Sequence, residues 1–481
     1  MKSRRNALWI ALIISLASGL ALPHSARGQE IPTNLLQQDF QIMRHTLEEA
    51  DGGLYRHTSK LDMDRTFDRA YGEIDHPMTA IEFWALVAPV VAHIKDSHLL
   101  VCWPKDFPLD HIPLLPLSVR VFGGRLFVYR DFSNDDGTLE GSEILSINGI
   151  PAKQITGKMM TSYNGEGNST TAAPYRIGYY NWFRRTLYGL MKIESPFRIT
   201  YRNSGGEEKG VTMVGKSLSD ISAASGARDS QPTTTADLKF LDGGKIAVLT
   251  IRHFYQYVDA KQKLMLHDFL QESFAKIHRK GSSALIIDLR GDSGGLDAPG
   301  AQLFSYLWDK PFEYYRDMVV NAREFDFFKY CPGAKPIPAD VVEKRRGGKF
   351  HYLNHPGLGL QQPCQPHFGG KVLALMNGGT DSTSCEFLSM LKLHERGTLI
   401  GEEAAGSYYG CQAGPFVVDL TLPNSKVWLP INLTTYYYVA SDYKYADRGM
   451  IPDYPVAHTI GDLLAGRDRD MDMALSLTGT K

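Results

Sequence analysis

One stretch of the chain decides its fold: residues 371–387, KVLALMNGGTDSTSCEF. Its apolar start, residues 371–376, is short and continuous, as in a strand that is buried on both faces of a parallel sheet. The pair Gly378-Gly379 marks a turn, and a helix is predicted to begin at Ser382. The stretch therefore predicts a serine hydroxyl beyond the carboxyl end of a strand, where α/β sheets place their sites.

The segments around this stretch alternate between strand and helix patterns. Strands are predicted at residues 245–251, 284–289, 371–376 and 398–400, and helices at about 261–278, 299–307 and 382–394. This alternation predicts an α/β domain over residues 236–460 with a mostly parallel sheet, followed by a C-terminal tail or helix over residues 461–481.

Two further modules are predicted upstream, so the chain as a whole is multidomain. Residues 29–103 are helical, because Leu36, Phe40, Met43 and Leu47 recur at the spacing of one helix face. A second helix is predicted after the capping pair Thr79 and Glu82. Residues 104–216 are β-rich, and the polar segment 217–235 is interpreted as a linker.

The β-rich module contains the hairpin sequence GSEILSING at residues 141–149. Its Asn148-Gly149 pair is typical of a type I′ turn between two strands. The stretch resembles a hairpin of PDZ domains, which bind extended peptides by adding a strand to a sheet. Any hairpin with a buried strand and this turn gives a similar pattern, and that alternative stays open.

The first residues have the three parts of a secretory signal peptide, predicted over residues 1–28. A basic start is followed by an apolar run from Ala7 to about Leu22 and by the small-residue site Ala26-Arg27-Gly28. A membrane anchor is the alternative, but polar and small residues make the apolar run shorter than a bilayer span. We expect cleavage near Gln29, a periplasmic or secreted protein, and no integral membrane span afterwards.

Charge and cysteine content exclude several classes of protein. The 52 basic and 53 acidic residues nearly cancel, so no bulk field favours nucleic acid or an anionic membrane surface. Five cysteines are too few for a disulfide scaffold, although export would permit a bridge between Cys331 and Cys364. No zinc-type cluster and no phosphate loop is found in the sequence, and no metal or organic cofactor is expected.

A second strand of the α/β domain runs into a turn of small residues, DLRGDSGG at residues 288–295. Such a turn can aim backbone N–H groups at a developing oxyanion, and glycine lets the backbone approach a substrate closely. The alternative is a plain connecting turn that needs positive φ angles. For Ser382 the alternative is a helix N-cap.

Four motifs together resemble the C-terminal processing, or tail-specific, serine protease family. They are DLRGDSGG at 288–295, LALMNGGTDSTSCEF at 373–387, LIGEEAAGSYYG at 399–410 and RGMIPDYPV at 448–456. The resemblance implies an α/β core of crotonase- or ClpP-like type with Ser382 as the nucleophile. It also implies an oxyanion hole formed at Gly294, Gly295 and Thr383.

The resemblance leaves the general base to be chosen between two branches of the family. One branch uses a lysine in the glycine-rich loop, but this chain has Ser407 at that place and no lysine in the loop. The tricorn-like branch uses a histidine preceded by serine, which corresponds to Ser97 and His98. Histidine titrates near neutral pH, so His98 is the predicted base and Ser97 its orienting partner. A structural histidine at a helix end is the alternative.

The acid that completes a tricorn-like set is a late glutamate, which this chain lacks. Asp447 is the nearest acid, with Asp442 second, and Asp447 could equally be a surface partner of Arg448. Cys385 is a rival nucleophile one turn beyond Ser382. Asp292 and Asp381 flank the site, and we interpret them as turn carboxylates that bond their own backbones.

The prediction is an exported serine endopeptidase that hydrolyses polypeptides through an acyl-enzyme. One alternative is a noncatalytic protein that binds peptides or other ligands on the same fold. Another is a hydrolase of a different acyl substrate, because the predicted site does not specify the leaving group. The oligomeric state is not predicted.

Overall fold

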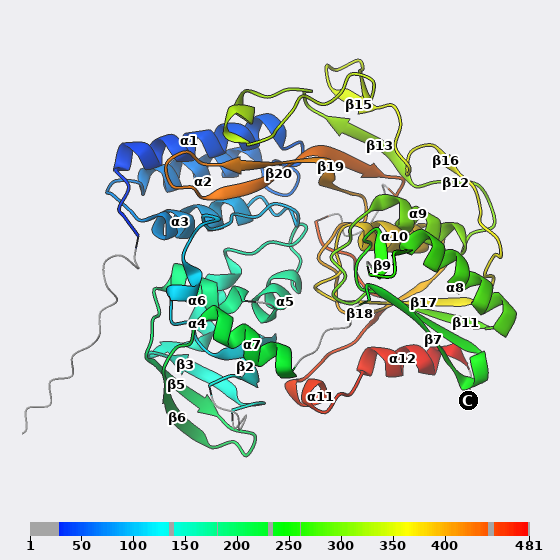
Figure 1. The fold of residues 1–481 in the computed structure, drawn as a ribbon, viewed down its shortest axis with the longest axis horizontal. Helices are drawn as coiled ribbons and strands as arrows, with labels where there is room; N and C mark the ends of the chain where they lie inside the picture. Colours follow the sequence, from blue (N-terminus) through cyan, green and yellow to red (C-terminus); the bar gives the residue numbers. More distant parts are fainter. Residues whose placement is uncertain are drawn as a thin grey trace, which may run out of the picture.

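The computed structural model describes residues 28–133, 139–179, 181–228, 234–259, 261–440 and 447–479. The predicted signal peptide and Asp442 lie outside these residues, apart from Gly28. Figure 1 shows the N-terminal helices at the upper left, the β-rich module below them, and the α/β layer on the right. No helix within the described ranges is both long enough and apolar enough to cross a bilayer.

The N-terminal part consists of α1 (Thr33–Ala50), α2 (Lys60–Gly72) and α3 (Ala80–Ala92). The predicted stripe of α1 is confirmed, since Leu36, Phe40, Met43 and Leu47 are all fully buried. The capping box of α3 is also present, because Thr79 and Glu82 each accept the other's backbone N–H. The segment that carries His98 therefore leaves a helix whose start and packing are well defined.

The β-rich module is an antiparallel sheet in the order β1-β2-β3-β5-β6, with β4 paired to β3. Its strands are β1 (Leu117–Phe122), β2 (Arg125–Asp131), β3 (Glu143–Ile147), β4 (Ile150–Pro151), β5 (Phe197–Arg202) and β6 (Glu208–Met213). Its helices are α4 (Ala152–Met160), α5 (Ala172–Gly178) and α6 (Trp182–Met191). Asn148 and Gly149 connect β3 to β4 with φ angles of 49° and 82°, which confirms the predicted type I′ hairpin. The PDZ resemblance remains a prediction.

The polar segment expected as a linker contains a helix, α7 (Leu218–Arg228). Ile221 is buried, and the Ser219 hydroxyl donates to Asp110 at 2.9 Å, so the helix is attached to the residues before β1. Composition alone missed this helix because one buried side chain and a few polar contacts are enough to dock a short helix on an existing surface.

The α/β layer is a six-stranded sheet in the order β21-β18-β17-β11-β8-β7. Its strands are β7 (Ala236–Leu241), β8 (Ile246–Ile251), β11 (Ala284–Asp288), β17 (Lys371–Met376), β18 (Thr398–Gly401) and β21 (Tyr454–Pro455). All neighbours are parallel except β7 and β8, which confirms the predicted mostly parallel sheet.

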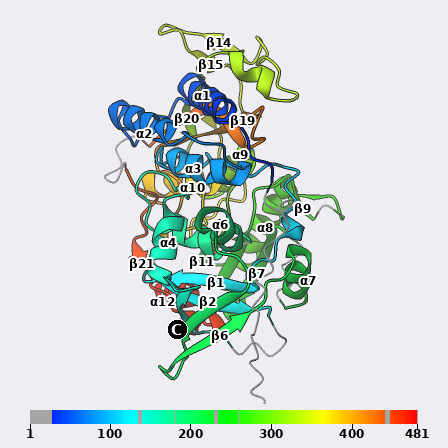
Figure 2. The same ribbon diagram turned by 90° about the vertical axis from the view of Figure 1, so that its left-hand side faces the viewer.

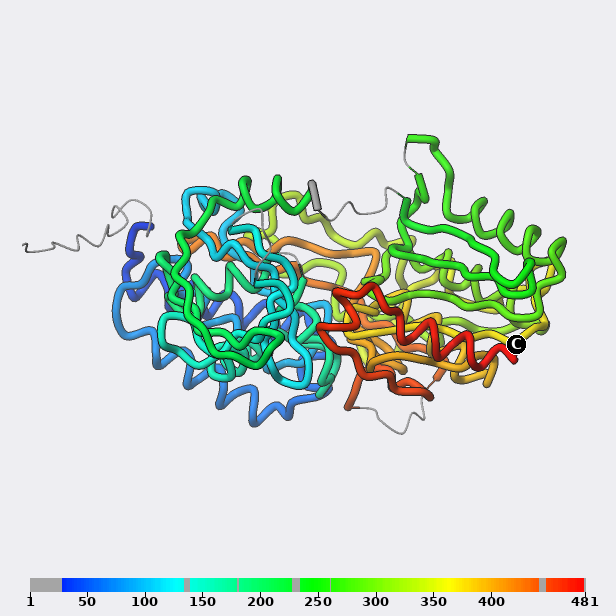
Figure 3. The backbone as a smooth tube through the Cα atoms, turned by 90° about the horizontal axis from the view of Figure 1, so that it is seen from below, coloured from blue at the N-terminus to red at the C-terminus, as the bar shows by residue number. Residues whose placement is uncertain are grey.

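Helices cover both faces of this sheet. They are α8 (Leu266–Lys280), α9 (Asp297–Ser305), α10 (Thr383–Leu393) and α12 (Arg469–Thr478). Figure 3 shows α12 in red across one face, where Ala474 belongs to a core with alternate residues of the strands. The remaining residues of the same strands face the large core that includes α8, α9 and α10. The continuous apolar runs of the sequence follow from this two-sided burial.

A second antiparallel sheet, in the order β14-β15-β13-β20-β19, joins the N-terminal helices to the α/β layer. Its strands are β13 (Tyr315–Val320), β14 (Val342–Lys344), β15 (Phe350–Tyr352), β19 (Gly410–Thr421) and β20 (Trp428–Tyr438). In Figure 2, β19 and β20 lie beside α1, and the turn after β19 is fixed there because Ser425 N–H donates to Asp39. The short elements are β9 (Tyr257–Asp259), β10 (Leu264–Met265), β12 (Phe312–Glu313), β16 (Leu360–Gln361) and α11 (Ile460–Leu464), with short 3-10 turns at Leu109–His111, Asp242–Gly244 and Asp326–Tyr330.

All five cysteines are free thiols. The bridge considered between Cys331 and Cys364 is therefore not formed in this structure. Cys331 is instead buried, and burial raises the pKa of its thiol to about 12. The segment between the two cysteines is held by its own strands, β14 and β15, rather than by a disulfide.

Candidate active site

Ser382 lies where β17 has ended and α10 begins, as the sequence predicted. Its backbone has φ 52° and ψ −129°, a conformation that side-chain-bearing residues rarely adopt. Its side chain makes no capping hydrogen bond, so the alternative role as an N-cap is not what the structure shows. Because the hydroxyl is not used for capping, it is available at the N-terminus of a helix, where partial positive charge favours an anion.

The glycine turn after β11 passes directly against Ser382. A Cβ atom on Gly294 would lie 2.5 Å from the Cβ of Ser382 and 2.8 Å from the nitrogen of Thr383. Only glycine fits this approach, and its φ of 91° adds a second requirement for glycine. The sequence prediction that these two loops meet is therefore borne out by the geometry.

The amide of Gly294 has a different partner from the one the resemblance implied. Its N–H donates to Oδ1 of Asp292 at 2.8 Å, and Asp292 is fully buried. Among the hydrogen bonds of the described residues, none uses the N–H of Gly295 or of Thr383. These two amides, rather than that of Gly294, are uncommitted beside the hydroxyl of Ser382.

Burial dominates the electrostatics of Asp292. It raises the pKa of the carboxyl group to about 8, and the hydrogen bond from Gly294 opposes this only in part. Cys385, the rival nucleophile, is also fully buried, and its thiol lies 3.5 Å from the carbonyl oxygen of Thr380. Burial raises the pKa of Cys385 well above its usual value, so the thiolate that nucleophilic attack requires is disfavoured.

Ser97 and His98 come from the segment after α3, and both reach the loop that precedes Ser382. The Ser97 hydroxyl donates to Oδ1 of Asp381 at 2.9 Å and lies 3.1 Å from Nδ1 of His98. Because the hydroxyl gives its only proton to Asp381, Nδ1 of His98 carries the proton of the second bond. Nε2 of His98 is then the unprotonated, basic nitrogen.

Nε2 of His98 is buried and has no hydrogen-bond partner among the described residues. In particular, no hydrogen bond joins it to the hydroxyl of Ser382 in this ligand-free state. Catalytic hydrogen bonds are often long or poorly aligned without substrate and tighten in the substrate complex. The structure thus places the half-buried His98 beside the loop that carries Ser382, with no hydrogen bond between Nε2 and the hydroxyl in this ligand-free state.

Two residues of the β-rich module hold the histidine segment in place. Arg176 of α5 donates to the carbonyl oxygen of Ser97 at 2.8 Å and lies 3.7 Å from Oδ2 of Asp381. Asn164 donates to the carbonyl oxygens of Asp96 and of Leu99, and accepts from Arg176 at 3.2 Å. The active-site segment is therefore positioned by the module that precedes the α/β domain in sequence.

The structure does not bring Asp447 to His98 through any contact of the described residues. Asp447 is exposed, and its carboxylate accepts from Asn168 at 3.3 Å. Its backbone carbonyl oxygen accepts from the amide of Asn168, so both its carboxylate and its backbone are bonded to Asn168. The alternative role of Asp447, as a surface partner of Arg448, is not seen either, because Arg448 pairs with Glu403. Among the described carboxylates, the one that contacts Ser97 is Asp381.

The sequence also missed a buried charge cluster formed by Glu166, Arg56 and His57. Oε1 of Glu166 accepts from His57 Nε2 at 2.9 Å and from Arg56 at 3.1 Å. Burial raises the pKa of Glu166, but the His57 bond and the charge of Arg56 outweigh it and lower that pKa. Arg56 also donates to the carbonyl oxygen of Gly410, so the cluster fixes the end of the loop at 401–410. No spacing in the sequence signalled it.

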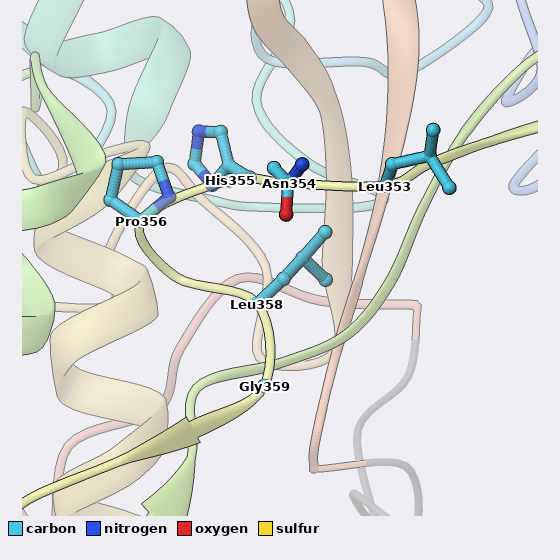
Figure 4. A pocket seen from close by; sticks show the side chains of 6 residues that line it. All are labelled: Leu353, Asn354, His355, Pro356, Leu358 and Gly359. Atoms are coloured by element: carbon cyan, nitrogen blue, oxygen red, sulfur yellow. The ribbon is translucent and has the colours of Figure 1, made fainter. Parts of the chain in front are cut away.

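No group of three or more His, Cys, Asp or Glu side chains within the described ranges is arranged to hold a metal ion. A hollow of about 490 Å³ is lined by Leu353, Asn354, His355, Pro356, Leu358 and Gly359 (Figure 4). All of these residues belong to one loop, so the hollow is a feature of that loop and not a cleft at Ser382.

Comparisons with known proteins agree with this geometry. Residues 245–456 match the family model of peptidase family S41, a range that contains Gly294, Gly295, Ser382 and Thr383. A search of curated proteins gives no match. The structure of mature CPAF aligns with a TM-score of 0.64 at 14% identity, covering 93% of this chain and 99% of that chain.

Two further solved structures match over most of the chain. The complex of mature CPAF with lactacystin gives a TM-score of 0.64 at 14% identity over 93% of this chain and 98% of that chain. The photosystem II D1 C-terminal processing protease gives 0.40 at 13% identity, over 88% and 93%. At these identities the CPAF structures show a shared fold alone, and the likeness to peptidase family S41 comes from the sequence match over residues 245–456. Residues 245–456 match peptidase family S41, as the sequence motifs predicted, and this match supports a serine peptidase.

Proposed function

We propose that the protein is an exported serine endopeptidase that cleaves polypeptides through an acyl-enzyme. The observation that carries this proposal is the arrangement at Ser382. An uncapped hydroxyl lies at the N-terminus of α10 against Gly294, and a half-buried histidine, whose Nδ1 faces the Ser97 hydroxyl, comes from another part of the chain. The export part rests on the signal-like sequence of residues 1–28.

In the proposed reaction, the hydroxyl oxygen of Ser382 attacks the peptide carbonyl carbon while Nε2 of His98 takes the hydroxyl proton. The resulting oxyanion is stabilised by the N–H groups of Gly295 and Thr383 and by the N-terminus of α10. His98 then gives its proton to the leaving amine, and the C–N bond breaks. Water, deprotonated by the same nitrogen, releases the acyl group and restores Ser382.

The step requires Nε2 of His98 to come within hydrogen-bond distance of the Ser382 hydroxyl. We expect substrate binding to bring the two side chains into this contact. The missing contact is also the observation that favours the second candidate, a noncatalytic peptide-binding protein on the same fold. The two candidates differ in whether Ser382 becomes reactive.

Covalent labelling separates these candidates. The mature protein would be treated with a fluorophosphonate probe, and the modified residue mapped by mass spectrometry, for the wild type and for Ser382→Ala and His98→Ala. We expect labelling at Ser382 that is lost in the first variant and slowed about 100-fold or more in the second, the usual effect of a general base. Absence of labelling in the folded wild type would favour the binding protein.

Two matched variants control for nonspecific effects. Ser384→Ala removes a buried hydroxyl two residues from Ser382, and His278→Ala removes an exposed histidine at the end of α8. Both should keep wild-type labelling. Comparing turnover of a peptide with that of an ester of the same acyl group then tests the substrate class. N-terminal sequencing of the protein from the periplasm or medium tests export, with a start near Gln29 expected.

A further inference from the structure

We propose that Asp381, the residue immediately before Ser382, is the acid that completes the relay to His98. Asp381 then has the role that the sequence led us to expect for Asp447. The inference rests on the proposed function, since it concerns how the base of that reaction is oriented and charged. Asp381 is a positioning residue, because it acts on His98 through the hydroxyl of Ser97.

The contacts of Asp381 support this role. Its Oδ1 accepts from the Ser97 hydroxyl at 2.9 Å and from the backbone N–H of Ser382 at 2.8 Å. One carboxylate oxygen therefore joins the orienting partner of the base to the backbone of the nucleophile. The residue is 7% exposed, which makes the charge of its carboxylate more effective than that of a solvated carboxylate.

The hydrogen bonds of the relay run from His98 through Ser97 to the negative charge of Asp381. When His98 takes the proton of Ser382 it becomes an imidazolium, and its Nδ1–H continues to donate to Ser97. Ser97 in turn donates to Asp381, so a negative charge lies at the far end of the chain of hydrogen bonds. This charge stabilises the imidazolium, and it holds the tautomer that leaves Nε2 basic before the reaction.

Other charged groups lie near His98, but they differ from Asp381. Oδ1 of Asp96 is 3.9 Å from Nδ1 of His98, and burial raises the pKa of Asp96 well above its usual value. Glu166 contributes charge from the β-rich module, but it is paired with Arg56 and His57. Arg176 faces Asp381 itself at 3.7 Å. Among the described carboxylates, Asp381 is the one bonded to Ser97.

The test is the variant Asp381→Asn, which keeps an oxygen that can accept from Ser97 and from Ser382 N–H but removes the charge. The readout is the rate constant of labelling by a fluorophosphonate probe as a function of pH. We expect the plateau rate to fall about 100-fold, within the usual range for general-base effects. The acidic limb of this pH–rate profile should also move about one pH unit to lower pH, because the imidazolium of His98 has lost a stabilising charge.

Three further variants make the outcome specific. Asp447→Asn tests the acid that the sequence favoured, and we expect its acidic limb to stay where the wild type has it. Asp317→Asn removes a carboxylate of β13 that lies 2.8 Å from Nδ1 of His351 on β15, and it is the matched control for loss of a carboxylate beside a histidine. Ser97→Ala breaks the relay, so adding Asp381→Asn to it should move the limb no further.

The possible outcomes distinguish failure of the proposed function from failure of the inference about Asp381. If the wild type is not labelled, the proposed function fails and the inference with it. If the wild type is labelled but Asp381→Asn keeps the wild-type limb, or if Asp447→Asn shifts it instead, the inference alone is overturned. Additive shifts from Ser97→Ala and Asp381→Asn would also overturn it. If Asp381→Asn does not fold, Ser97→Ala and Ser97→Thr decide, since only the hydroxyl-bearing variant should keep the limb.

Discussion

The carboxyl group of Asp292 is predicted to destabilise the folded protein increasingly as the pH rises. Asp292 is fully buried, and burial raises its pKa from the ordinary value of 3.8 to about 8. A group with a raised folded-state pKa contributes its full stability below pH 3.8, and this stability is lost as the pH rises towards 8. Replacement by Asn, which has the same shape and no charge, removes this dependence.

The magnitude follows from the interval between the two pKa values. At about 1.4 kcal/mol per pH unit, the stability lost between pH 3.8 and pH 7 reaches an upper limit of about 4 kcal/mol. At pH 5 the corresponding limit is about 1.6 kcal/mol. Asp292→Asn should therefore be more stable than the wild type at pH 7, by less at pH 5, and by nothing at pH 3.

The assay is urea unfolding of both proteins at these pH values, followed by fluorescence and compared through the midpoint concentrations. Asn can still accept the N–H of Gly294, so the turn is expected to keep its conformation. Asp317→Asn serves as the control, since Asp317 is partly exposed and should give no difference that grows with pH. A difference for Asp292→Asn that is constant with pH, or a loss of stability at pH 7, would refute the reasoning.

Two other substitutions test contacts between the modules. Gly379→Ala would place a Cβ atom 2.2 Å from the ring of Tyr175, so we expect a loss of about 1–3 kcal/mol in stability and slower labelling at Ser382. Glu166→Gln removes the buried charge that pairs with Arg56 and His57, and should cost about 3–5 kcal/mol, measured by thermal unfolding.

Each of these has a control on the same chain. Gly72→Ala adds a Cβ atom where no atom lies within 4 Å, so stability and labelling should be unchanged. Glu343→Gln removes one partner of an exposed pair with Arg345, and the change in unfolding temperature should be small. If Gly379→Ala resembles its control, the contact with Tyr175 does not hold the catalytic loop. If Glu166→Gln resembles its control, the cluster is not a stabilising pair.

Much of the fold could be predicted because its signals are local. The strand of residues 371–376, the helix that follows Ser382 and the capping box at Thr79 each depend on residues a few positions apart. The hairpin at Asn148 and Gly149 depends on two residues that accept positive φ angles. Patterns of this kind are fixed by backbone sterics and burial periodicity, which a single sequence contains.

The second antiparallel sheet and α7 were not predicted for the opposite reason. β13 pairs with β20, more than a hundred residues later, and no local pattern relates the two. The polar composition around α7 hid its single buried side chain, Ile221. The expected linker and the considered disulfide were both inferred from composition, which carries no information about which surfaces come together.

By itself, the sequence predicted Ser382 as the nucleophile and His98 as the base, because each belongs to a short motif that resembles a known family pattern. Only the tertiary structure shows which described carboxylate contacts Ser97. The Ser97 hydroxyl contacts Asp381, 284 residues away, while Asp447 is held by Asn168. Such a contact is set by how the helical part, the β-rich module and the α/β sheet pack together, and packing between distant segments leaves no periodic trace in a sequence.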